Sequence, residues 1–329
     1  MAKLFMMDFP RADIALTPCY KDEELLGELS RASSDQAPLP KIKEAYGHIL
    51  FPDPPADRPY AVSSIVLSSD GKMAFSDHPA GPVIAKNNFL DPQGALADFW
   101  VLNALRAYCD GVVVGARTLQ AEAMATSHIF DPELLSQRGQ FLKRRGRHPA
   151  TIVVSFDGTD IPLDHLLFRI DESEGYGVGI ATSPRGADYL AKHAPRPVRI
   201  VDGEASADFG LFGPGLPLPV FTTGTGSMPD APALLSRLRA LGMERLLIES
   251  PSYTAHLMSL GLLDEFFINY SMVFAGGPIT PNSGSPFSSA VHPHAQLAMV
   301  SMHRGSFMFT RQLLRYGVGM AEDLGKLHY

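Results

Sequence analysis

Residues 243–277 constrain the fold of this chain more than any other stretch. They read MERLLIESPSYTAHLMSLGLLDEFFINYSMVFAGG. The pattern predicts a short apolar strand at 246–249 that ends on Glu249, a short helix that closes at Gly261, and a second apolar strand at 266–274. A strand, a helix and a strand with polar or glycine residues at the strand ends is how α/β folds form nucleotide sites. The stretch therefore predicts an α/β fold with a nucleotide site at this edge.

The chain from Arg58 onward also indicates an α/β fold. Short β-branched runs alternate with helical patterns, which is typical of strands covered by the helices that connect them. Further strands are expected at 61–67, 111–114, 151–155, 178–181, 198–201, 220–222 and 307–316. Helices are expected at 96–108 and 230–242. We therefore expect a mostly parallel central sheet flanked by helices, with antiparallel strands near the C-terminus.

The first 57 residues differ from the rest of the chain. One helix is expected at 21–30, and prolines are dense after it, at positions 38, 40, 52, 54, 55 and 59. Such proline density is typical of linkers and irregular surface segments. The sequence therefore predicts two parts. Residues 1–57 form an N-terminal extension that packs on the main domain or on a partner subunit, and residues 58–329 form one domain.

Composition excludes several classes of protein. The 329 residues are 45% hydrophobic with a formal charge of −7, so the chain can bury a large core and lacks the basic excess of most nucleic-acid-binding proteins. Two cysteines are too few for a disulfide framework or a cysteine-based metal site. No apolar run is long enough for a membrane span, and Asp8 and Pro10 interrupt the short one at the start. We expect a cytoplasmic protein without a nucleic-acid, membrane or metal partner.

Two loops that come after predicted strands offer hydrogen-bond donors to an anion. The loop at 114–118 contains Gly115, which allows close backbone approach, followed by Arg117 and Thr118. The loop TTGTGS at 222–227 leads into a predicted helix and is rich in hydroxyl groups. Backbone N–H groups between a strand and a helix commonly bind phosphate. The second loop is interpreted either as a phosphate site or as an ordinary connection.

Glu249 ends a predicted strand inside an apolar pattern. A carboxylate there costs free energy unless a partner satisfies it. Two interpretations are compatible with this position. The carboxylate could accept hydrogen bonds from a ribose hydroxyl, or it could be a structural group that ties down the loop at Gly276 and Gly277, which is the interpretation we favour.

Seven short segments occur in the order found in one known family. They are RPY at 58–60, SSDGK at 68–72, LRA at 105–107, DGVVVGARTLQAE at 110–122, LRALGMERLLIE at 238–249, GLLDEFFINYSMVFAGG at 261–277 and LLRYG at 313–317. In these segments the chain resembles the C-terminal reductase domain of bacterial riboflavin-biosynthesis deaminase/reductases. The resemblance implies a dihydrofolate-reductase-like fold for residues 58–329.

The resemblance also implies an activity. It points to an NADPH-dependent oxidoreductase similar to 5-amino-6-(5-phosphoribosylamino)uracil reductase, with NADPH expected ahead of NADH. The substrate would be a pyrimidine-like, pteridine-like or ribosylamino-pyrimidine heterocycle. The cofactor supplies the hydride, while the protein holds the nicotinamide against the substrate in a dry cleft. The assembly that the resemblance implies is a homodimer.

The positions that match the family give the expected site residues. Asp70 and Lys72 would act in catalysis beside the substrate, and Ser68, Glu122 and His128 would also contact it, together with Asp70. Phe156 is an alternative to Ser155 near the adenosine phosphate. The cofactor would be held by Gly115, Thr118, Ser155, Glu249, Ser250, Gly276 and Gly277.

The chain departs from the family pattern inside this site. Glu249 is followed by Ser250 and Pro251 where the family has two glycines, and proline has no N–H to offer a phosphate. The arginine that faces the substrate phosphate in the family has His128 as its nearest counterpart. The alternative function is therefore a protein with the reductase fold but without turnover, which binds a nucleotide or a protein partner.

Overall fold

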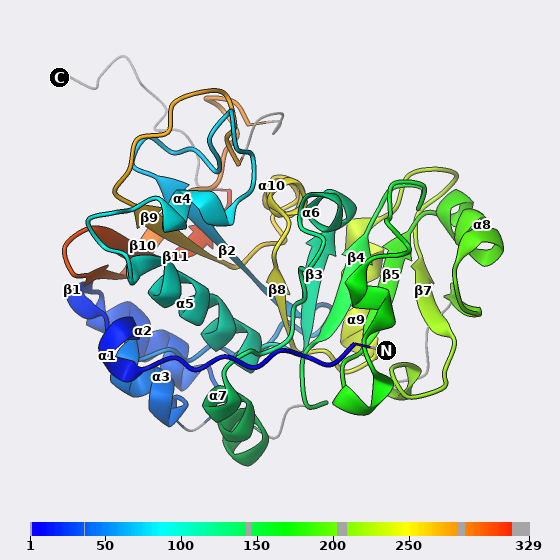
Figure 1. Cartoon of the computed structure of the whole chain (residues 1–329), viewed down its shortest axis with the longest axis horizontal. Helices are drawn as coiled ribbons and strands as arrows, with labels where there is room; N and C mark the ends of the chain where they lie inside the picture. Colours follow the sequence, from blue (N-terminus) through cyan, green and yellow to red (C-terminus); the bar gives the residue numbers. More distant parts are fainter. Residues whose placement is uncertain (1, 36, 143–145, 203–208, 282–286, 318–329) are drawn as a thin grey trace.

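The computed structural model is built on one broad sheet (Figure 1). It describes residues 2–35, 37–142, 146–202, 209–281 and 287–317. Within these residues eleven strands pair in the order β1-β10-β11-β9-β2-β8-β3-β4-β5-β7-β6. Strands that are neighbours in the sheet are often far apart in the chain, as expected when crossovers connect parallel strands.

Most of the sheet is parallel, as predicted. The apolar strands β3 and β8 occupy its centre, where both faces are covered. The parallel strands are β9 (Glu265–Ser271), β2 (Tyr60–Ser68), β8 (Arg245–Ile248), β3 (Gly111–Gly115), β4 (Ala150–Val154), β5 (Val178–Thr182), β7 (Leu218–Thr222) and β6 (Val198–Val201).

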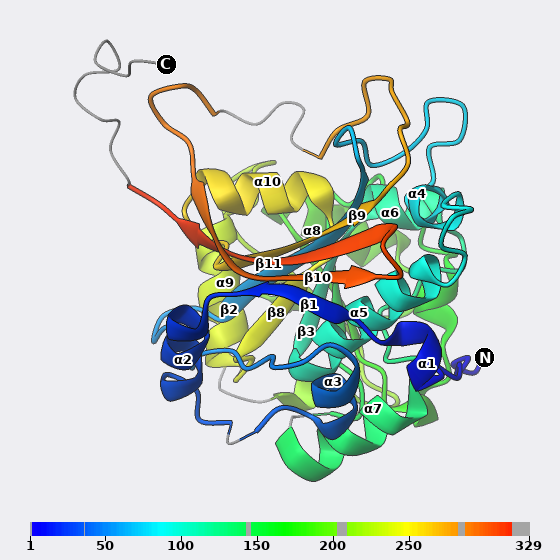
Figure 2. The same ribbon diagram turned by 90° about the vertical axis from the view of Figure 1, so that its left-hand side faces the viewer.

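The antiparallel strands lie at the edge of the sheet next to β9, as Figure 2 shows. β11 (Phe307–Arg315) pairs with β9 and with β10 (His294–His303), and β1 (Thr17–Lys21) pairs with β10. Neither β10 nor β1 was predicted. All five residues of β1 are exposed, so the strand has no apolar face from which its pairing could be inferred.

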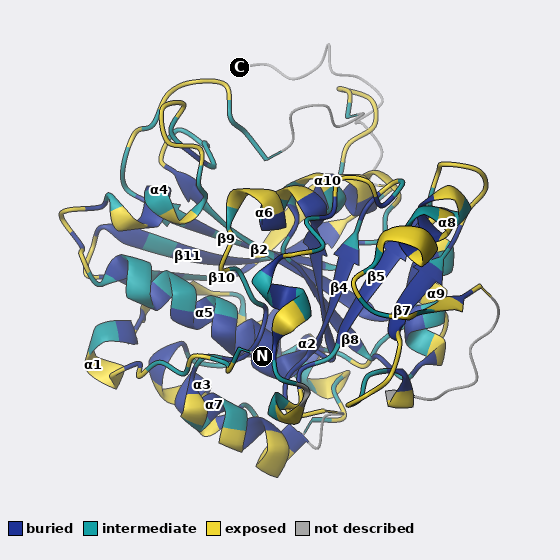
Figure 3. Ribbon diagram, turned by 45° about the vertical axis from the view of Figure 1, so that its right-hand side comes forward, coloured by how far each residue is buried: buried dark blue, intermediate teal, exposed yellow. Residues whose placement is uncertain are grey.

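Helices cover both faces of the sheet. Side chains of β3 alternate between the two layers, so that Val112 and Val114 pack on one side and Val113 packs on the other. The first layer includes α5 (Gly94–Tyr108), α6 (Ala116–Ala121) and α8 (Pro184–His193). The second includes α9 (Ala231–Ala240) and α10 (Pro251–Ser259). In Figure 3 the central strands are dark blue, the colour of buried residues.

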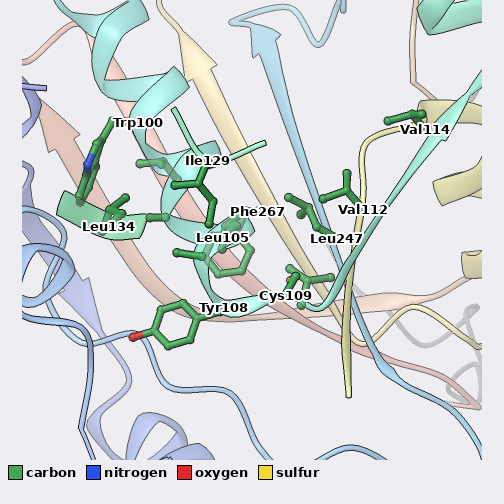
Figure 4. Packing of buried hydrophobic residues seen from close by; sticks show 14 of the residues in the cluster. Trp100, Leu105, Tyr108, Cys109, Val112, Val114, Ile129, Leu134, Leu247 and Phe267 are labelled. Atoms are coloured by element: carbon green, nitrogen blue, oxygen red, sulfur yellow. The ribbon is translucent and has the colours of Figure 1, made fainter. Parts of the chain in front are cut away.

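Helix α5 carries the core of the first layer, where Trp100, Leu105 and Tyr108 are completely buried. Figure 4 shows these side chains with Leu247 and Phe267 of the sheet. The Tyr108 hydroxyl donates to a carbonyl at Ile49 at 2.9 Å and accepts from the N–H of Leu39 at 3.0 Å. The tyrosine therefore satisfies backbone groups of the N-terminal segment inside the core.

The N-terminal segment is ordered against the main body of the molecule. Its buried Lys41 forms an ion pair with the buried Asp131 at 2.7 Å. The predicted helix at 21–30 is observed at 23–31, where Asp22 caps it by accepting from the N–H of Leu25. The helices here are α1 (Arg11–Ile14), α2 (Glu23–Arg31) and α3 (Pro40–Ala45). The division at residue 57 remains a prediction.

The remaining elements are short. They are α4 (Pro82–Lys86), α7 (Pro132–Gln137), a π-helical turn at Arg138–Leu142, and 3-10 turns at Leu166–Arg169, Glu172–Glu174 and Phe209–Leu211. No helix in the described part of the chain combines the length and the apolar character that crossing a membrane requires.

Candidate functional site

The carboxyl ends of the central strands form the candidate site. In the parallel register Gly115 of β3 lies beside Val154 of β4, and Val113 lies beside Ile248 of β8. The residues that come directly after these strands therefore meet at one edge of the sheet. Ligands of open parallel sheets bind at this edge.

Gly115, Thr118 and Ser250 come together at that edge. A Cβ atom added to Gly115 would lie 2.8 Å from the Ser250 Oγ and 3.9 Å from the Thr118 Oγ1. The close approach explains why glycine stands at the end of β3, since any larger residue would displace the Ser250 hydroxyl. Three of the residues predicted to hold the cofactor are thus neighbours.

Helix α10 begins at the same place. Ser250 is its N-terminal flanking residue and makes no side-chain cap, and Pro251 is its first helical residue. Proline is well suited to this position, because the N–H groups of the first turn have no intrahelical acceptor. Ser252 and Tyr253 retain their N–H groups, so the substitution at Pro251 removes one donor and leaves the others in place.

Glu249 is held by an arginine. Its two carboxylate oxygens accept from Nε and Nη2 of Arg106 on α5, both at 2.7 Å. The remaining Nη1 of Arg106 donates to the carbonyl of His128 at 3.0 Å. Our favoured interpretation, that Glu249 ties down the loop at Gly276 and Gly277, is therefore wrong.

Asp70 anchors that loop instead. Its carboxylate accepts from the N–H of Ala275 at 3.0 Å, the N–H of Gly276 at 2.8 Å and the Ser68 hydroxyl at 2.6 Å. These hydrogen bonds lower the pKa of Asp70 to about 2. β2 and β9 run side by side to Ser68 and Ser271, which brings the two loops together. The contacts of Asp70 are those of a loop anchor.

Only glycine fits at position 277, because of its backbone conformation and its close contact with a neighbouring side chain. Its φ is +73°, and an added Cβ would collide with the Ser76 Oγ. Gly276 has φ of +63° and open space around it. On the other side of Asp70, Lys72 pairs with Ser68 through its backbone, since the N–H of Ser68 donates to its carbonyl at 2.9 Å.

His128 is buried and has partners at both ring nitrogens. Nε2 lies 2.8 Å from the carbonyl of Phe5, to which it donates, and Nδ1 accepts from the Thr126 hydroxyl at 2.8 Å. Burial lowers the pKa of His128 to about 4. The ring is therefore neutral near pH 7 and supplies no charge to a ligand.

Glu122 comes directly after α6 and is half-buried. Its backbone is fixed, because its N–H donates to the Thr118 carbonyl and its own carbonyl accepts from His165 Nε2, both at 2.9 Å. Burial, and next the nearby Glu249, raise the pKa of Glu122, while Arg106 lowers it. Among the described residues its carboxylate has no hydrogen-bond or ion-pair partner.

Ser155 comes after β4, and its hydroxyl already has two hydrogen-bond partners within the protein. Its hydroxyl donates to Asp160 and accepts from the N–H of Gly158, so it closes its own loop. The neighbouring Phe156 is 65% exposed. The loop at 222–227 is likewise closed by backbone bonds between Thr225 and Met228, as in an ordinary strand-to-helix connection.

Sequence reasoning missed the role of Arg106. The residue lies in the LRA segment, but its partner Glu249 is 143 residues away. A lone arginine among the apolar residues of α5 was the available signal, because a buried guanidinium needs an anionic partner.

A small pocket under the start of α10 was also missed. It is lined by Ser63, Ser64, Ile65, Ile248, Ser250, Pro251, Thr254, Phe266 and Pro281.

Several solved structures share this architecture. A pyrimidine reductase-like protein from Corynebacterium diphtheriae superposes with a TM-score of 0.54 at 19% identity, covering 82% of this chain and 96% of that one. RibD from Acinetobacter baumannii gives 0.52 at 15% identity, covering 79% of this chain and 59% of that one. The Thermotoga maritima diaminohydroxyphosphoribosylaminopyrimidine deaminase/5-amino-6-(5-phosphoribosylamino)uracil reductase gives 0.51 at 15% identity, covering 78% and 56%.

These similarities concern three-dimensional structure. No protein-family model matches the sequence, and no curated protein matches it either. The chain spans about 59% of the length of the RibD chain that it resembles. At such low identity the similarity establishes the fold. The chain therefore has the dihydrofolate-reductase-like fold of the reductase domains of riboflavin-biosynthesis deaminase/reductases.

Proposed function

We propose that this protein is an NAD(P)H-dependent oxidoreductase that reduces a pyrimidine-like or pteridine-like heterocycle by hydride transfer. The observation that carries the proposal is the meeting of Gly115, Ser250 and the start of α10 beside the Glu249–Arg106 pair. The reductase-domain fold supports the same class of reaction, because the similar structures include two named as reductases or reductase-like.

The residues at this edge fit a dinucleotide. Gly115 leaves room for close backbone approach, and the hydroxyls of Thr118 and Ser250 lie beside it. The N–H groups of Ser252 and Tyr253 at the start of α10 suit a phosphate, because the positive end of the helix dipole lies there. The donor set is thus one that binds anions. We propose NADPH ahead of NADH as the cofactor.

In this proposal the protein contributes binding and orientation. The cofactor, when bound, supplies the hydride. Glu249, which Arg106 holds by two hydrogen bonds, offers a fixed carboxylate to a ribose hydroxyl or to the ring of the substrate. Asp70 fixes the loop at Gly276 and Gly277 that borders the substrate. Such fixed groups promote hydride transfer by holding the two rings in reacting geometry.

Cofactor binding tests the proposal. We expect NADPH to raise the melting temperature of the protein, because a ligand held at about 100 times its Kd stabilises the native state by about 2.7 kcal/mol. Gly115→Leu should abolish the increase, since the new side chain displaces Ser250. Gly139→Leu is the control, because an added Cβ there meets no atom within 4 Å. No increase with millimolar NADPH or NADH for the wild type would contradict the proposal.

One observation favours the alternative function, a binding protein without turnover. Pro251 takes one N–H donor away from the start of α10, which weakens the anion site. The two functions differ in a measurable way. An enzyme oxidises NADPH when a reducible heterocycle is added, which the loss of nicotinamide absorbance reports. A binding protein shows the increase in melting temperature with no change in absorbance.

A further inference from the structure

Residues 2–9 form an N-terminal strap that crosses the molecule. In Figure 1 the dark blue chain runs from the N-terminus to α1. At one end of the strap Ala2 forms a parallel bridge with Ile170, and at the other end the side chain of Phe9 is buried in the core. Between these ends Phe5 is exposed to solvent. The strap is therefore fixed at both ends and open to water on its outer side.

The middle of the strap contacts the loop between α6 and α7. The carbonyl of Phe5 accepts from His128 Nε2 at 2.8 Å, and the N–H of Met7 donates to the carbonyl of Phe130 at 2.9 Å. His128 is only 1% exposed, so its ring nitrogens depend on partners within the protein. The strap thus holds the loop at two residues, His128 and Phe130.

Helix α5 holds the same two residues from another direction. Asn103 Oδ1 accepts from the N–H of Phe130 at 2.7 Å, and Arg106 Nη1 donates to the carbonyl of His128 at 3.0 Å. The guanidinium of Arg106 also lies 5.9 Å from the centroid of the Phe130 ring, within the range of a cation–π contact. The position of this loop is therefore set by the strap and α5 together.

Arg106 connects the loop to the cleft. Its Nε and Nη2 donate to the two oxygens of Glu249, both at 2.7 Å. Glu249 stands between Ile248 and Ser250, which both line the pocket under the start of α10. Because a guanidinium is rigid and planar, a movement of Nη1 with the carbonyl of His128 turns the two nitrogens that face Glu249. The orientation of this carboxylate therefore depends on His128.

We propose that the N-terminal strap positions the Glu249 carboxylate for cofactor binding, through His128 and then Arg106. This inference rests on the proposed function, because it gives a part of the chain outside the cleft a role in that same cleft. His128 is then a positioning residue, and its ring does not touch the substrate. A carboxylate that is oriented before binding loses less freedom when a ribose hydroxyl donates to it, so it binds more tightly.

Two variants of His128 test the connection between the strap and Arg106. His128→Gln keeps an N–H donor for the carbonyl of Phe5, whereas His128→Phe keeps a flat ring without a donor. The readout is the exchange with water of the Arg106 Nε–H proton, which Glu249 accepts, measured by NMR of the full-length protein. We expect exchange to become roughly tenfold faster in His128→Phe and to stay close to the wild-type rate in His128→Gln.

NADPH affinity, measured by fluorescence titration, is the second readout. His128→Phe and a protein that lacks residues 2–7 should bind NADPH roughly tenfold less tightly than the wild type, because about one hydrogen bond to a charged group is lost. His128→Gln should retain most of the affinity. Ile42→Val is the control, since Ile42 is completely buried in α3 and takes no part in this series of hydrogen bonds. It should lower the melting temperature and change neither readout.

The outcomes separate this inference from the proposed function. If NADPH binds to the wild type while His128→Phe changes neither the exchange of the Arg106 proton nor the affinity, the inference is wrong and the reductase proposal stands. If NADPH does not bind to the wild type, the reductase proposal fails, and the exchange of the Arg106 proton still shows whether the strap positions Glu249. An Ile42→Val protein that loses as much NADPH affinity as His128→Phe also overturns the inference, because the effect would then follow stability alone.

Discussion

Two arginine–glutamate pairs in this protein have the same chemistry and different roles. Arg311 on β11 contacts both oxygens of Glu265, at 2.7 and 2.9 Å, and Arg106 contacts both oxygens of Glu249 at 2.7 Å. Each guanidinium also donates to a backbone carbonyl, at Leu50 for Arg311 and at His128 for Arg106. Bidentate geometry alone therefore does not tell a structural pair from one in a site.

The place of each glutamate in its own strand and its burial tell the two pairs apart. Glu265 is the first residue of β9, whereas Glu249 comes after the last residue of β8. In the register with β2, which lies between β9 and β8, Glu265 is level with Val62 and Ile248, the residue before Glu249, is level with Ser63, so the two glutamates differ little in height along the sheet. The Arg311–Glu265 pair is completely buried, while the side chain of Glu249 keeps 13% of its surface exposed. Only the Arg106–Glu249 pair, which follows the end of its strand and is not completely buried, can meet a ligand.

The largest effect is expected from breaking the buried pair. Arg311→Met leaves the charge of Glu265 buried without a partner, which should cost about 3–5 kcal/mol of unfolding free energy. The loss would be measured by urea unfolding. The double variant Arg311→Met/Glu265→Gln should lose less, because no charge is left behind and the new amide oxygen still accepts from Tyr60, as Glu265 does at 2.8 Å. A double variant as unstable as the single one would show that the charge is not the cause.

The next largest effect on stability is expected at His128, whose carbonyl accepts a hydrogen bond from Arg106. Burial lowers the pKa of His128 to about 4, below its ordinary value of 6.5. The native state therefore binds a proton less readily than the unfolded state. The stability that neutral His128 contributes is complete above about pH 6.5 and is lost as pH falls towards about 4, by about 2–3 kcal/mol.

His128→Gln should reduce this dependence on pH, with unfolding by urea followed between about pH 7 and about pH 4. Part of the dependence should remain, because burial also lowers the pKa of the neighbouring His148, to about 3. His128→Gln unfolding with the same loss of stability on acidification as the wild type would show that His128 does not titrate as its environment implies.

Breaking the Arg106–Glu249 pair should cost less unfolding free energy than breaking the Arg311–Glu265 pair. Arg106→Met leaves Glu249 partly exposed to water, so we expect a loss of about 1–3 kcal/mol. The difference in role should appear in ligand binding. Arg106→Met should weaken NADPH binding, whereas Arg311→Met, at a temperature where it is folded, should not. Equal losses of NADPH affinity would remove the distinction between the two pairs.

The sequence predicts the buried strands of the sheet better than it predicts the contacts between side chains that lie far apart in the chain. Apolar runs such as Val112–Val114 specify buried parallel strands, because each residue in them is covered on both faces. The exposed β1 has no such pattern. Glu249 could be recognised as a carboxylate in need of a partner, but the partner depends on how α5 packs on the sheet, which no local pattern encodes.

The same limit explains the error over the loop at 276–277. The register of β2 with β9 places Ser68 beside Ser271, and this pairing brings Asp70 to the loop. Glu249 is nearer in sequence but lies on a different strand. Residues on one strand and the turn after it could be predicted, as at Gly115. Contacts that require the register of two distant strands could not.

The smallest effect on stability is expected at Asp70, which is only half-buried and lies in a loop. Asp70→Asn keeps one acceptor and turns an amide group towards a backbone N–H, so it should weaken the hold on Ala275 and Gly276 while leaving the melting temperature almost unchanged. Hydrogen exchange of these two amides should become faster. Asp157→Asn, at another half-buried aspartate whose pKa is lowered by hydrogen bonds within its loop, should leave both amides as they are. If Asp70→Asn instead lowered stability as much as Arg106→Met, the loop would belong to the folded core, and the separation between a rigid sheet edge and a locally anchored loop would not hold.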